Sequence, residues 1–149
     1  MKQLLVVFAC SLLCCVSCGS DDGEPIPGRP AGSAPQIADL GWDPPSATVG
    51  DGSGAITVNC TVNFADADMD LDTILVRFRQ DCGRGSWQEV PKNVIGQTAG
   101  RTQGEIDFDF IAETDCPASN FPYEISARDA TNRYSNVLTL QFILDEPPP

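Results

Sequence analysis

Apolar and polar residues alternate one by one over several segments between residues 55 and 143. In the first of these segments, every second residue from Ile56 to Phe64 is apolar, and the residues between them are Thr or Asn. Side chains with a period of two point to opposite faces of a β-strand, so the pattern predicts strands with one buried and one solvated face. The pattern recurs in 74–79, 105–110, 123–128 and 137–142.

No segment shows the three-to-four-residue spacing of an amphipathic helix. Half-buried strands separated by short turn-rich stretches predict an all-β fold, an antiparallel β-sandwich. Arg77 and Arg79 then face Glu124 across neighbouring strands, on a face that we expect to be solvated. We expect about seven strands, near 37–42, 55–64, 73–80, 86–90, 104–111, 122–130 and 136–143.

The first residues of the chain have the character of an export signal. Lys2 precedes an apolar run at residues 4–16, and the small residue Ser17 follows it. The run is shorter than the roughly 20 residues that a membrane-spanning helix needs. Residues 1–17 are therefore predicted to be a signal peptide that is removed on export.

The sequence VSCGS at residues 16–20 resembles the lipobox of bacterial lipoproteins. The resemblance implies that Cys18 carries the lipid, such as palmitate, and that the chain is anchored at the cell envelope. Cys15 stands where that family usually has an aliphatic residue, so cleavage near Gly19 without lipid stays an alternative. Gly19, rather than Asp, follows the cysteine, and by the same resemblance this favours the outer membrane or cell surface over the inner membrane.

Composition divides the remaining chain into three parts. Residues 18–35 are rich in Gly, Pro, Ser and acidic residues and are predicted to be a flexible tether, which reaches about 50 Å if it is extended. Residues 36–144 hold all the alternating segments and form the predicted sandwich domain. Residues 145–149 are a short polar tail.

The charge of the chain excludes several functions. It has 9 basic and 21 acidic residues, no histidine and a formal charge of −12. Such a surface repels nucleic acid. The absence of histidine removes the histidine-based catalytic triads and zinc sites. We expect no cofactor, with calcium as the one ion that the acidic residues favour.

Two motifs carry a second resemblance. The sequence ADADMDLD at residues 65–72 and the sequence YEISARDATN at residues 123–132 are similar to loops of immunoglobulin-like and fibronectin type III-like domains of bacterial surface proteins. The resemblance covers residues 37–144 and implies an immunoglobulin-like sandwich. Such a fold carries many functions, so the resemblance implies no particular one.

In such a sandwich, the loops that contain Cys82 and Cys116 lie at the same end, which implies a disulfide between them, with two free thiols as the alternative. By the chain-entropy estimate, this disulfide contributes roughly 4 kcal/mol. Cys60 lies in phase with the inward residues, and the residue opposite it is near Ala127. Cys60 is therefore predicted to be a buried free thiol.

Four aspartates fall at every second position, and calcium binds six to eight oxygen ligands of this kind. Met69 stands where a calcium loop usually has glycine. Asp129, from a loop at the same end of the sandwich, is a further candidate ligand. An exposed acidic loop without metal is the alternative. The four aspartates are Asp66, Asp68, Asp70 and Asp72.

We therefore expect a non-enzymatic, lipid-anchored binding or structural module whose partner is an envelope protein or a glycan. Candidate contacts are Trp87, Arg133 and Tyr134, together with the loop at residues 66–72. Trp87 could equally cap the core. A calcium-stabilised spacer or accessory subunit is the alternative function, and a glycosidase with paired carboxylates is disfavoured because a small sandwich offers no cleft between two acids.

Overall fold

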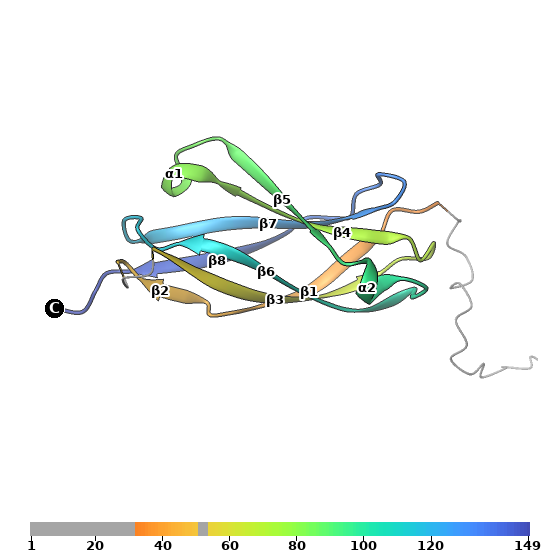
Figure 1. Cartoon of the computed structure of the whole chain (residues 1–149), viewed down its shortest axis with the longest axis horizontal. Helices are drawn as coiled ribbons and strands as arrows, with labels where there is room; N and C mark the ends of the chain where they lie inside the picture. The colour runs from red at the N-terminus through yellow and green to blue at the C-terminus, as the bar shows by residue number, and fades with distance from the viewer. Residues whose placement is uncertain (1–31, 51–53) are drawn as a thin grey trace, which may run out of the picture.

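The structure is a computed structural model that describes residues 32–50 and 54–149; the predicted signal peptide and Cys18 lie outside this part. Two sheets pack face to face (Figure 1). One sheet has three strands in the order β1 (Gln36–Asp43), β3 (Ala55–Ala65) and β6 (Gln103–Glu113). The other has five strands in the order β2 (Ser46–Thr48), β8 (Leu138–Asp145), β7 (Ser119–Asp129), β4 (Leu71–Arg79) and β5 (Trp87–Asn93).

The strand pairs are antiparallel except for β2 and β8, which are parallel. The prediction of an antiparallel immunoglobulin-like sandwich is therefore confirmed. The described residues form eight strands, because the chain continues after β1 into the short strand β2 of the other sheet. Pro44 and Pro45 separate the two strands, and proline has no N–H group with which to continue a ladder.

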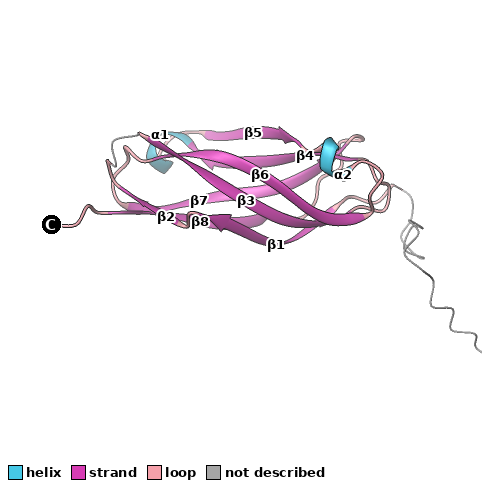
Figure 2. Cartoon of the chain, turned by 60° about the horizontal axis from the view of Figure 1, so that its bottom comes forward, coloured by secondary structure: helices cyan, strands magenta, loops and turns pink. Residues whose placement is uncertain are grey.

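The segment between β5 and β6 forms no strand. It contains α2 (Ile95–Thr98), a single turn of helix, while the turn α1 (Gln80–Gly83) joins β4 to β5. Strands β5 and β6 are thus terminal strands of different sheets and do not pair with each other. Figure 2 shows α1 and α2 towards opposite ends of the elongated sandwich.

The core consists mainly of the inward residues that the alternation predicted, together with residues outside those segments such as Leu71 and Val94. Val58, Ile74, Ile106, Ile125 and Leu140 are all fully buried, and burial of a side chain of this size stabilises a fold by about 1.5–3 kcal/mol. All the strands lie between residues 36 and 145, and so do the core residues. A protein made of residues 19–149 therefore keeps every strand and every core contact of the described chain.

The outer face of the five-stranded sheet differs from the expected solvated surface around Leu75. Leu75 points away from the core cluster, yet it is only 2% exposed. Its neighbours across the sheet are Pro91 on β5 and Ser126 on β7. Beyond the paired part of β7 and β8, Arg128 forms an isolated antiparallel bridge with Tyr134. This face therefore has a small apolar centre of its own.

Candidate functional site

The turn between β3 and β4 is organised by the carboxylate of Asp66, which is 1% exposed. Its oxygens accept hydrogen bonds from the backbone N–H groups of Asp68, Asp70 and Leu71 at 3.3, 2.9 and 2.8 Å. Aspartate favours such turns because its short side chain reaches the N–H groups that follow it. Asp66 therefore shapes the turn that carries the other acidic residues.

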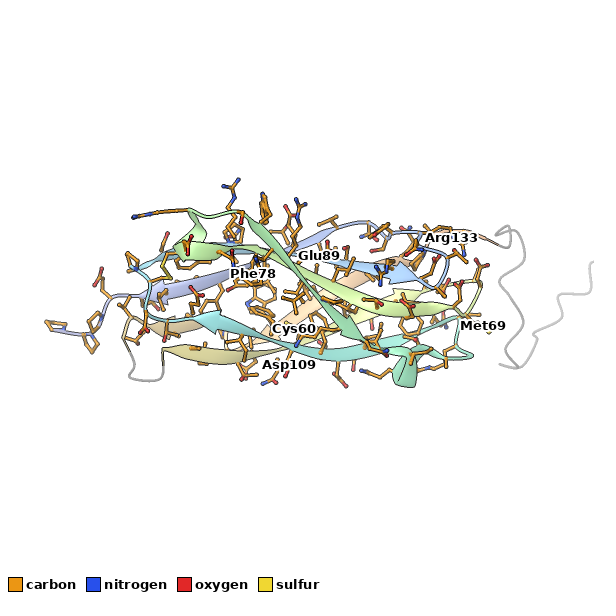
Figure 3. All side chains as sticks on the ribbon, turned by 45° about the horizontal axis from the view of Figure 1, so that its top comes forward. Cys60, Met69, Phe78, Glu89, Asp109 and Arg133 are labelled. Carbon is orange, nitrogen blue, oxygen red and sulfur yellow. A yellow bond between two sulfur atoms is a disulfide. The ribbon has the colours of Figure 1, made fainter. Side chains whose placement is uncertain are left out.

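Met69 lies at the tip of this turn with a φ of 59°. Residues other than glycine rarely adopt this left-handed conformation, which costs them roughly 1–2 kcal/mol. The chain thus makes a sharp turn with methionine at the position where a calcium loop usually has glycine. Figure 3 shows Met69 and Arg133 at the same end of the sandwich.

The turn between β7 and β8 is built in the same way around Asp129. One oxygen of its carboxylate accepts hydrogen bonds from the N–H groups of Thr131 and Arg133, both at 2.9 Å, and from the Thr131 hydroxyl at 2.8 Å. The other oxygen accepts a hydrogen bond from Arg133 Nε at 2.7 Å. The Asp129 side chain is fully buried, so these bonds replace its contact with water.

The guanidinium of Arg133 joins the two turns. Its Nη2 lies 2.6 Å from Asp68 Oδ2 and 3.6 Å from Asp70 Oδ2, while its Nε holds Asp129. Both carboxylate oxygens of Asp68 also accept the N–H of Gly32 at 2.8 Å. A single cation therefore faces three carboxylates, and the segment that precedes β1 is tied to the same cluster. We name Asp66, Asp68, Asp70, Asp129 and Arg133 the acidic cluster.

The aspartates of this cluster differ in their electrostatics. The backbone N–H of Gly32 and the guanidinium of Arg133 hold the pKa of Asp68 below its ordinary value. Burial alone would raise the pKa of Asp129, but hydrogen bonds from Arg133 and Thr131 outweigh it and lower that pKa. The pKa of Asp70 is raised by burial and by the charges of Asp129 and Asp66. Of these three aspartates, Asp70 is therefore the one whose negative charge is least stabilised by its surroundings.

The predicted calcium ligands come together only in part. One oxygen from each of Asp66, Asp68 and Asp70 lies within 4.8 Å of the others. Oδ1 of Asp70 is buried and has no hydrogen-bond partner among the described residues. Asp72 is not part of the group, and its Oδ1 accepts the hydroxyl of Thr73 at 2.6 Å. From the sequence, Arg133 was a candidate contact with a partner; in the structure, it supplies a positive charge to the cluster.

The cysteines of the sandwich are arranged as expected. Cys82 and Cys116 form a disulfide with a Cα–Cα distance of 5.4 Å, which joins α1 to the connection between β6 and β7. Cys60 is a free thiol in the core, 2% exposed. Burial and the charge of Asp109 raise the pKa of its thiol to about 12, so it is almost entirely protonated at neutral pH.

Trp87 lies half-buried on the outer face of the five-stranded sheet and is not part of the core cluster. The guanidinium carbons of Arg77 and Arg79 lie 4.7 and 5.1 Å from the centre of its ring, within the range of cation–π contacts. Arg77 also pairs with Glu124 at 3.2 Å, as predicted, whereas Arg79 contacts Trp87 instead.

A shallow depression of about 190 Å³ lies on the same outer face. Tyr134, 53% exposed, and Val137, 57% exposed, line it. Glu89 and Glu124 also line it, so the face combines aromatic, arginine and aliphatic groups with two carboxylates. We name Arg77, Arg79, Trp87, Tyr134 and Val137 the arginine–tryptophan face.

A scan of protein-family models and a search of curated protein sequences found no match for this chain. Among solved structures, it is similar to a Niemann-Pick type C2 protein from the Japanese carpenter ant, with 10% identity, a TM-score of 0.48, and coverage of 76% of this chain and 94% of the other. It is also similar to the PKD domain of an M14-like peptidase from the Thermoplasmatales archaeon SCGC AB-540-F20, with 19% identity, a TM-score of 0.44, and coverage of 75% and 96%. At these values, the likeness concerns the general shape alone.

The described residues contain no helix that is long and apolar enough to span a bilayer. The predicted lipid attachment at Cys18 lies outside those residues.

Proposed function

We propose that this chain is a lipid-anchored, non-catalytic binding module of the bacterial cell envelope, attached through Cys18 and favouring the outer membrane or cell surface. The lipobox resemblance at residues 16–20 supports the anchor. The Cys82–Cys116 disulfide supports an oxidising location, because structural disulfides persist mainly outside the cytoplasm.

The observation that carries the binding role is the composition of the arginine–tryptophan face. Tryptophan, tyrosine and arginine are the residues that most often dominate the energy of protein interfaces. Here they gather on one sheet, although the chain has 21 acidic and only 9 basic residues. The partner that fits best is an envelope protein that presents carboxylates around an apolar spot, and a glycan is the second partner class.

The anchor is tested in a bacterial host with the full chain. Cys18→Ser removes the lipid attachment, so labelling with radioactive palmitate is lost and the protein moves from the membrane fraction to the soluble fraction. Cys10→Ala, a cysteine of the apolar run outside the lipobox, is the matched control and retains both. If the two variants behave alike, Cys18 is not the attachment site.

The binding face is tested by cross-linking residues 19–149 to intact envelopes, followed by quantitative mass spectrometry. Trp87→Ala and Tyr134→Ala are expected to lose the same partner. Ile111→Ala, which removes a 56% exposed side chain from β6, is the matched control and retains it. A partner that is captured equally by all variants would show that this face does not bind.

A calcium-stabilised spacer is the second candidate, favoured by the close oxygens of Asp66, Asp68 and Asp70 and by the unpartnered Oδ1 of Asp70. Calcium is expected to raise the melting temperature of the protein, and magnesium is not, because calcium accepts irregular oxygen sites. Asp70→Asn abolishes the response, whereas Asp72→Asn, outside the group, retains it. An unchanged melting temperature in millimolar calcium rejects this candidate.

A further inference from the structure

The sandwich is open along the side where β5 and β6 face each other without pairing. A cleft of about 590 Å³ lies there, within the size range of small-molecule sites. Figure 3 looks onto this side, with Cys60 and Asp109 labelled below β5. Its lining includes Cys60, Lys92, Val94, Asp107, Phe108 and Asp109.

The deepest lining residues are apolar. Cys60, Val94 and Phe108 belong to the core and are 2%, 2% and 9% exposed. The cleft therefore reaches the surface of the core between the two sheets. A small apolar group that enters it would contact side chains already held in place by the core, which keeps the entropic cost of binding low.

The rim of the cleft carries an excess of negative charge. Lys92 Nζ lies 2.7 Å from Asp109 Oδ1, and this pair lowers the pKa of Asp109 and connects β5 to β6 across the opening. The charge of Asp109 also contributes to the raised pKa of the Cys60 thiol, so this carboxylate acts on the floor of the cleft.

Asp107 is the second carboxylate of the rim and is held rigidly by its backbone. The side-chain amide of Gln97 donates to the Asp107 carbonyl and accepts from the Asp107 N–H, both at 2.8 Å, as a neighbouring strand would. The Asp107 carboxylate makes no hydrogen bond or ion pair within the described part of the chain. One solvent-exposed carboxylate without a protein partner among the described residues therefore stands at the rim of the apolar floor.

We propose that this cleft binds a small amphipathic organic cation, an alkylammonium group whose amine pairs with Asp107 and whose chain lies on Val94, Phe108 and Cys60. The negative rim and the formal charge of −12 favour a cation over an anion or a neutral molecule of the same length. This site is on the open side of the sandwich, and it does not depend on the arginine–tryptophan face.

The test is an NMR titration of residues 19–149, with the disulfide formed, using hexylammonium, hexanol and hexanoate in about 150 mM salt, where surface charges are screened beyond about 8 Å. Hexylammonium is expected to shift the amide signals of the lining residues saturably, with a Kd at least tenfold below that of hexanol. Hexanoate is expected to bind more weakly than either. Shifts that do not saturate, that spread over the whole acidic surface, or that are equal for the three probes overturn the proposal.

Two substitutions give opposite expected effects. Asp107→Asn raises the Kd of hexylammonium about tenfold, and Glu105→Gln, on the same strand but outside the cleft, leaves it unchanged. Lys92→Met lowers the Kd several-fold because it frees Asp109, and Arg84→Met, the matched loss of a distant positive charge, does not. If Asp107→Asn and Glu105→Gln have equal effects, the cation binds to the general surface charge and the site is rejected.

Discussion

Replacement of Asp129 by asparagine tests the cluster that joins the two turns at one end of the sandwich. The substitution keeps the size of the side chain. An asparagine oxygen can still accept the N–H groups of Thr131 and Arg133, which bond to one oxygen of Asp129 at 2.9 Å. The new NH₂ group, however, replaces the oxygen that accepts Arg133 Nε at 2.7 Å, so two donors face each other.

The expected loss follows from that one contact. A hydrogen bond between charged groups contributes about 1.5–3 kcal/mol, and a buried donor left without an acceptor adds to the cost. We therefore expect Asp129→Asn to lower the free energy of unfolding by about 2–3 kcal/mol, measured by urea denaturation with circular dichroism. Thr131→Val removes only the bond from the hydroxyl to the same carboxylate at 2.8 Å, in which one partner is charged, and should cost about 1.5 kcal/mol.

The pH dependence gives a second check on the same substitution. The folded-state pKa of Asp129 is lowered, so its contribution to stability is present above the ordinary aspartate pKa of about 3.9 and is lost as the pH falls through the folded value. The difference between the wild type and Asp129→Asn should therefore shrink below about pH 4. A difference that stays constant down to pH 2, or a cost no greater than that of Thr131→Val, would refute the role assigned to this carboxylate.

Two further predictions concern the backbone and the disulfide. Met69→Gly should stabilise the protein by about 0.5–1 kcal/mol in urea denaturation, because glycine adopts the φ of 59° without steric cost, whereas Met69→Ala should bring no gain. Cys82 and Cys116 are 34 residues apart, and reduction of their disulfide should lower the free energy of unfolding by up to about 4 kcal/mol. Reduction should cause the same loss in the Cys60→Ala variant, because Cys60 is not part of the disulfide.

The alternation of side chains was sufficient to predict the sandwich and most of its strands, because a period of two fixes which face of a strand is buried. It could not predict β2, whose three residues are too few to show a period. It also missed the burial of Leu75, since alternation tells which face of a strand a side chain lies on but not what else packs on that face.

The sequence predicted that the aspartates of the acidic cluster lie together, but it did not predict that Arg133 lies among them. The spacing of Asp66, Asp68 and Asp70 indicated a cation site, and the structure brings these residues together. Arg133 follows Asp129 by four residues within a turn, a spacing that carries a clear meaning in a helix but not in a loop. The cleft beside Asp107 left no sequence signal, because it arises from two strands that do not pair.

The position of the acidic cluster also bears on which surface meets a partner. Gly32, the first described residue, donates its N–H to Asp68, so the chain enters the sandwich at the end that carries the cluster. Figure 1 shows the C-terminus and α1 at the opposite end. In a chain anchored through Cys18, the loops at residues 66–72 and 129–133 would then face the tether. The two outer sheet faces and the end with α1 would be the surfaces presented to a partner, which favours the arginine–tryptophan face over the acidic loops as the place of contact.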